Sequence, residues 1–122
     1  MEIDSSRGMV RQGDVLLVPI KCRPLVPLEE AHDVRGVVLA EGETSGHFHA
    51  VSGGEAHLFR FRDGRASSLL EVGTGGAVVR VIGGGAGGMD RHTPVAVEMG
   101  LYEVRLQKRW DSAAMSAFQV QD

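Results

Sequence analysis

Two of the five histidines of this chain stand at a spacing that suits metal binding. They belong to the run Gly-His-Phe-His, in which His47 and His49 alternate with a phenylalanine. If residues 47–51 form a β-strand, both imidazoles point to the same face, about 7 Å apart along the strand. Two such rings can bind one ion, and Glu43 and His92 are the predicted completing ligands. A His/carboxylate set with an open position suits Zn²⁺, Fe²⁺, Mn²⁺ or Ni²⁺.

The open position would hold water, so the chain is predicted to bind a divalent metal ion and to be a candidate small-molecule metalloenzyme. Whether it is an enzyme stays open at this point. The alternative is a non-catalytic oligomeric assembly or regulatory module without metal, in which the glycine-rich residues 83–88 order against a partner. A third reading gives the histidines an acid–base or pH-sensing role without metal.

The elements that would position these histidines are short strands. Apolar, β-branched runs alternate with Gly, Asp and Pro turn signals, and no stretch shows the period of an amphipathic helix. The pattern predicts an all-β fold, a small barrel or sandwich of about 7–10 strands. One domain is expected over residues 1–122, with 1–12 and 111–122 peripheral. The expected strands are 15–20, 34–40, 47–51, 56–61, 67–72, 77–82, 94–99 and 101–110.

Gly53-Gly54 predicts a tight hairpin between residues 47–51 and 56–61, because two glycines supply the positive φ that such a turn needs. In that register Ala50 faces His57. Cross-strand partners share a face, so His57 is expected with the phenylalanines, away from His47 and His49. His32 is expected to be exposed in the loop 22–33.

The clearest strand pattern is that of residues 101–110. Tyr102, Val104 and Leu106 alternate there with charged or amide side chains. This period of two predicts one buried face and one solvated face.

Composition limits the classes of partner. The net charge of −3 gives no general reason to bind nucleic acid or anionic lipid, although arginines cluster locally. No apolar run is long enough to span a membrane, and residues 1–6 lack the apolar core of a signal peptide. The single Cys22 cannot form an internal disulfide, which favours a cytoplasmic location. Exposed strand edges favour a homo-oligomer, most simply a dimer, and a small-molecule ligand remains an option.

Two resemblances add to this reading. The Gly-x-x-x-Gly-His-x-His pattern at residues 42–49 resembles the first metal motif of the cupin superfamily, over about 15 residues. The resemblance implies a metal at this motif. A looser likeness spans most of the chain: Arg-Gln-Gly-Asp-Val-Leu-Leu from Arg11 and Gly-Leu-Tyr-Glu-Val-Arg-Leu-Gln from Gly100 are similar to small bacterial and phage proteins. That likeness implies no activity.

Overall fold

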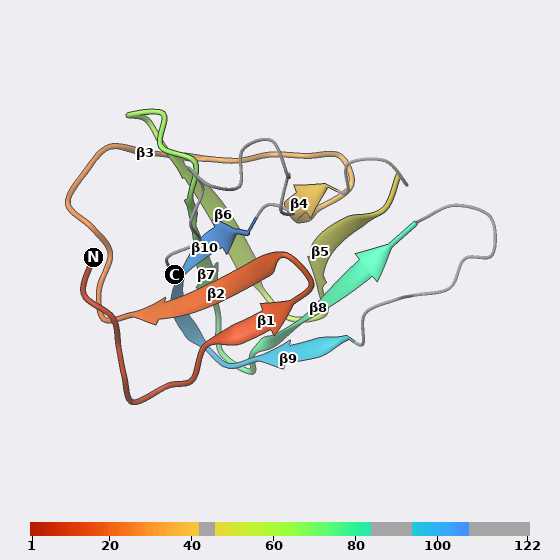
Figure 1. The fold of residues 1–122 in the computed structure, drawn as a ribbon, viewed down its shortest axis with the longest axis horizontal. Helices are drawn as coiled ribbons and strands as arrows, with labels where there is room; N and C mark the ends of the chain where they lie inside the picture. The colour runs from red at the N-terminus through yellow and green to blue at the C-terminus, as the bar shows by residue number, and fades with distance from the viewer. Residues whose placement is uncertain (42–45, 84–93, 108–122) are drawn as a thin grey trace, which may run out of the picture.

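The computed structural model describes residues 1–41, 46–83 and 94–107. These ranges form ten strands and no helix, so the predicted all-β class is confirmed (Figure 1). In these ranges there is accordingly no helix that could cross a membrane. The strands are β1 (Val10–Gln12), β2 (Val15–Ile20), β3 (Leu28–Glu30), β4 (Val37–Glu41), β5 (Phe48–Ser52), β6 (Ala56–Phe61), β7 (Ser68–Val72), β8 (Ala77–Ile82), β9 (Val95–Val97) and β10 (Gly100–Leu106).

All strand pairs are antiparallel and belong to two sheets. One sheet has six strands in the order β1-β2-β10-β7-β6-β3, and the other has four in the order β4-β5-β8-β9. The described strands do not close into a barrel, so the sandwich is the architecture of the two that were expected. β3 lies inside the segment 22–33, so the prediction that this whole segment is a loop is wrong.

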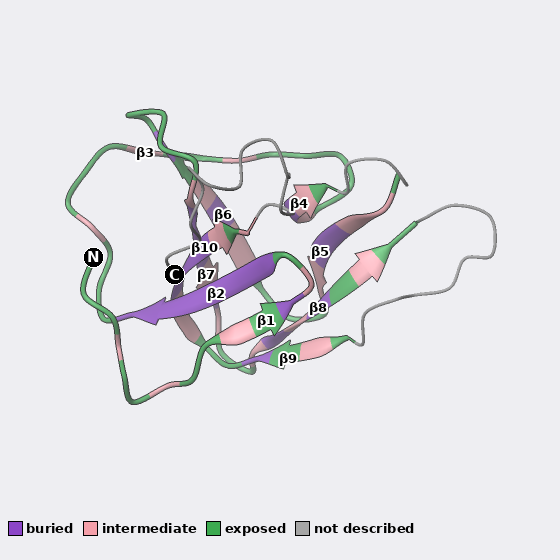
Figure 2. Cartoon of the chain, viewed as in Figure 1, coloured by how far each residue is buried: buried purple, intermediate pink, exposed green. Residues whose placement is uncertain are grey.

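The main core lies between the two sheets. Most of its buried residues come from β2, β6, β7 and β10 of the six-stranded sheet, where Leu17, Leu70 and Tyr102 are at most 2% exposed. Leu39 and Val79 contribute to it from the four-stranded sheet. Figure 2 shows β2 buried along its whole length. Burial of this apolar surface is the main force that holds the sheets together.

The six-stranded sheet is also apolar on its second face. Ile20, Phe61 and Leu69 form a separate buried cluster there. Glu103 lies on this face between Val18 and Leu69, and it is only 9% exposed. The prediction that this face of β10 is solvated is therefore wrong at Glu103, whose Oε1 accepts a 2.8 Å hydrogen bond from Arg105.

The expected hairpin between β5 and β6 is wrong. Gly53 and Gly54 do adopt positive φ angles of 67° and 83°, but β5 pairs with β4 and β8 while β6 pairs with β3 and β7. The two glycines carry the chain from one sheet to the other. Two glycines permit either connection, because both need only a sharp reversal at positive φ. The register that placed Ala50 opposite His57 does not exist.

Candidate functional site

His47 immediately precedes β5 and His49 lies within it, on the face of the strand that carries Val51. Val51 packs against the core between the sheets, so His49 points into the sandwich, and it is 5% exposed. The ring of His47 lies edge-on to that of His49, with the centroids 6.0 Å apart. The alternation expected from the sequence therefore does bring the two imidazoles together.

Gln12 of β1 holds the buried histidine. Its Oε1 lies 2.9 Å from Nδ1 of His49, and its Nε2 donates to the carbonyl oxygen of Val79 at 3.0 Å. Gln12 is itself 5% exposed, so an edge strand of one sheet hydrogen-bonds two strands of the other. Sequence reasoning missed this residue, because nothing local in the run around Gln12 indicates a partner 37 positions away.

The contact with Gln12 sets the chemistry of the His49 ring. Since the amide Nε2 donates to Val79, the amide oxygen is the acceptor, and Nδ1 of His49 carries the proton. The lone pair of the neutral ring then resides on Nε2. Histidines that bind metals usually donate their second ring N–H to a fixed acceptor in this way.

The distance between the two rings is longer than that of a pair already set to bind one ion. A metal–nitrogen bond of about 2 Å puts each ring centroid about 3 Å from the ion, so two rings at a tetrahedral angle lie about 5 Å apart. The centroids of His47 and His49 are 6.0 Å apart, so the rings would have to approach each other by about 1 Å to share a tetrahedral ion. No third Cys, His, Asp or Glu joins them as a metal-binding group within residues 1–41, 46–83 and 94–107.

The two other predicted ligands, Glu43 and His92, lie outside the described residues. Described positions that flank them in the chain can be placed relative to the histidines. A Cβ built on Gly83 would lie 3.1 Å from the carbonyl oxygen of Gly46 and 3.7 Å from Cα of His47. Val95 pairs with Val79, whose carbonyl accepts from Gln12. Glu43 is three residues before Gly46, and His92 is three before Val95.

His57 shares a face of β6 with Phe59 and Phe61, as predicted, although the register that suggested it does not exist. Its side chain is 43% exposed. Nδ1 lies 2.9 Å from Glu30 Oε2 and Nε2 lies 3.6 Å from Glu55 Oε2. The hydrogen bond with Glu30, and then that with Glu55, raises the pKa of His57 above its ordinary value.

This raised pKa predicts a pH dependence. A proton bound more tightly in the folded state contributes stability at pH values below the unfolded pKa, about 6.5, and that contribution is lost as pH rises through the folded pKa. Thermal unfolding of the wild type and of His57→Gln should therefore differ more at pH 6 than at pH 9. In an NMR titration, Glu30→Gln should lower the pKa of His57. An unchanged pKa in that variant would contradict the role of Glu30.

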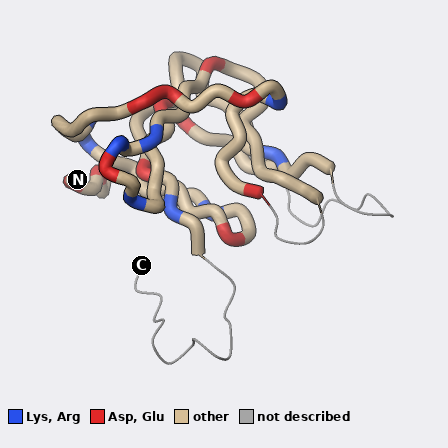
Figure 3. Tube along the Cα trace, turned by 90° about the horizontal axis from the view of Figure 1, so that it is seen from above, with Lys and Arg blue, Asp and Glu red and all other residues tan. Residues whose placement is uncertain are grey.

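Charged side chains elsewhere are mostly paired. Figure 3 shows acidic and basic positions interspersed along the described chain. Arg35 forms ion pairs with Asp33 and Glu41, and its guanidinium lowers the pKa of Asp33 to about 2. Arg65, one of the locally clustered arginines, pairs with Asp63 at 2.6 Å. Exposed pairs of this kind usually contribute little to stability.

Comparison with known proteins places the chain in a family. Neither the curated proteins nor the solved structures gave a match. A family model does match, over residues 11–107, which includes Gln12, His47, His49 and every strand from β2 to β10. That match covers well over half of the sequence. The chain therefore belongs to the family described as "Domain of unknown function (DUF8820)".

Proposed function

We propose that this protein binds one divalent transition-metal ion, Zn²⁺, Fe²⁺, Mn²⁺ or Ni²⁺, through His47 and His49. The observation that carries the proposal is the buried hydrogen bond between Nδ1 of His49 and Gln12. Both groups are only 5% exposed, and the hydrogen bond compensates them for the hydration that they lose. The same bond fixes the tautomer whose lone pair lies on Nε2, the nitrogen through which His49 would bind a metal.

Glu43 and His92 are proposed as the completing ligands. The chain lengths support this: Glu43 is three residues from Gly46, which immediately precedes His47, and His92 is three residues from Val95, which pairs with Val79 on the strand next to β5. A residue of extended chain spans about 3.3–3.6 Å. A mixed set of imidazoles and a carboxylate matches the ligand preferences of these ions. If a position remains open, the bound ion would supply Lewis acidity or an activated water to a small polar substrate, as in a metalloenzyme.

Elemental analysis of untagged protein tests the proposal. The wild type should contain close to one transition-metal ion per chain, and His47→Ala/His49→Ala should contain almost none. The matched control is His32→Ala/His57→Ala, which removes two histidines away from the site and should retain the metal. Single Glu43→Gln and His92→Ala variants should each bind more weakly.

Two outcomes would overturn this function. One is a wild type that holds no metal and takes none up on titration; this favours the metal-free oligomeric module. The other is a double variant with wild-type metal content. Because His49 is buried, circular dichroism is used to check that the double variant is folded. The half-buried His47 is also replaced alone by Gln, because this change leaves the contact between His49 and Gln12 intact.

A further inference from the structure

A pocket of about 420 Å³ opens at the edge of the six-stranded sheet where β3 ends. β3 pairs with β6 only through Leu28, Glu29 and Glu30, and the last bond runs from the Ala31 N–H to the Leu58 carbonyl at 2.8 Å. Beyond it the chain turns away through residues 32–36 toward β4. The first residues of β6 therefore have no neighbouring strand on this side, and the pocket occupies the space.

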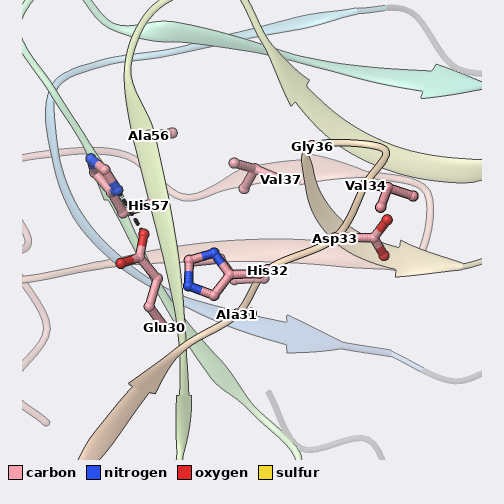
Figure 4. A pocket seen from close by; sticks show the side chains of 10 residues that line it. Glu30, Ala31, His32, Asp33, Val34, Gly36, Val37, Ala56 and His57 are labelled. Carbon is pink, nitrogen blue, oxygen red and sulfur yellow. Dashed lines mark hydrogen bonds and ion pairs between the residues drawn. The ribbon is translucent and has the colours of Figure 1, made fainter.

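The walls of this pocket differ in character. Val37, Ala56 and Leu58 give an apolar surface at its inner side. At one side Glu30 and His57 meet in the ion pair drawn in Figure 4. The carboxylate of Glu55 approaches the same imidazole from its other nitrogen, at 3.6 Å. An apolar cavity with a few convergent polar groups is the general form of a small-molecule site.

The backbone of β6 also contributes polar groups to this pocket. The Leu58 carbonyl points toward β3, and in an antiparallel ladder the backbone groups of alternate residues point the same way. The N–H and C=O of Ala56 therefore also point to this side, where β3 no longer runs alongside. They offer one donor and one acceptor at the apolar wall.

The charges around His57 give the polar end an acidic excess. Glu30 comes from β3, Glu55 from the turn before β6, and Glu71 from the neighbouring β7. His57 lies between Glu30 and Glu55, and Arg23 lies 3.6 Å from Glu71. Asp33 also lines the pocket, but Arg35 neutralises it at 2.8 Å. His32 lines the pocket too and opposes a cation when it is protonated. While His32 is neutral, the three carboxylates therefore face two cations, the imidazolium of His57 and the guanidinium of Arg23.

We infer that this pocket binds a small primary amine, with its ammonium group between Glu30 and Glu55 and its short apolar body against Val37, Ala56 and Leu58. The ammonium takes the place that the imidazolium of His57 occupies between the two carboxylates. Ligand and imidazolium therefore compete, and deprotonation of His57 favours the ligand. A carboxylate ligand of the same shape meets only repulsion from Glu30 and Glu55.

The test is an NMR titration of the full chain with n-butylammonium chloride, and with sodium butyrate as the anion of matched shape. We expect shifts centred on Ala56 and His57 with the amine alone. Glu30→Gln should weaken binding about fivefold, as expected for loss of one partly exposed ionic contact. The matched control Glu29→Gln alters the neighbouring carboxylate, which lies opposite Arg60 in the ladder and on the other face of β3, and should bind as the wild type does.

Competition between the amine and the imidazolium of His57 predicts opposite effects on affinity for two variants. His57→Gln removes the competing cation and should bind the amine more tightly, whereas Glu30→Gln binds it more weakly. Wild-type binding should strengthen from about pH 6 to about pH 8.5, and His57→Gln should lose most of that dependence while His32→Gln keeps it. Equal binding of amine and butyrate, or wild-type affinity in Glu30→Gln, would overturn the inference. None of these measurements depends on His47 or His49, so the metal proposal is tested separately.

Discussion

Replacing Gly54 with alanine is expected to lower the free energy of unfolding by about 3–5 kcal/mol, from overpacking added to left-handed backbone strain. Gly54 has a φ of 83°, and a Cβ there would lie 2.0 Å from the carbonyl oxygen of Gly76. That oxygen belongs to the connection between β7 and β8, whose backbone is itself packed against Val97 at Gly76. The clash therefore cannot be relieved by rotating a flexible side chain. Urea unfolding followed by circular dichroism measures the loss.

Gly53→Ala is the matched control for this prediction. Gly53 has a similar φ of 67°, but no atom lies within 4 Å of the Cβ position. It should cost only about 1 kcal/mol, the strain of one left-handed residue. Equal losses in the two variants would show that the backbone angle alone matters and that Gly54 is not packed against Gly76 as described.

Gln12→Leu is expected to weaken metal binding by about 10–100-fold, the usual effect of losing the group that orients a ligating histidine. It should also destabilise the metal-free protein by about 1–3 kcal/mol, because Nδ1 of His49 and the carbonyl of Val79 lose a buried partner. Isothermal titration with Zn²⁺ measures the first effect and chemical denaturation the second. This prediction rests on the proposed function.

Gln12→Glu separates orientation from stability. A carboxylate still accepts the proton of Nδ1 of His49, but it cannot donate to the Val79 carbonyl. We expect metal affinity near that of the wild type together with a clear loss of stability. If Gln12→Leu and Gln12→Glu bind Zn²⁺ equally well, Gln12 stabilises the fold and does not orient a ligand.

The sequence predicted the local part of the candidate site and failed on the long-range part. That His47 and His49 share one side of a strand follows from an alternation of two, which tertiary structure did not override. The partnership of His49 with Gln12 depends on β1 crossing the edge of the other sheet. No periodicity within either strand carries that information.

The same distinction explains the errors in the fold. The strand over residues 15–20 was predicted with its observed bounds because its apolar run is continuous. The sheet to which β6 belongs was not predicted correctly, because Gly53-Gly54 permits a hairpin or a change of sheet equally well. At β10 the alternation was read as buried and solvated, but both faces of this central strand carry apolar neighbours, and Glu103 is enclosed while Leu106 is 44% exposed.

The order of strands in the six-stranded sheet has a consequence for how the chain becomes structured. β10, the last described strand, lies between β2 and β7 in the middle of that sheet. Until β10 has been synthesised, β2 and β7 each lack the strand with which they pair in the native sheet. The sheet therefore remains two separate fragments during synthesis until residues 100–106 become available. Assembly then has to close long loops at once, which makes folding slow compared with a protein of local contacts.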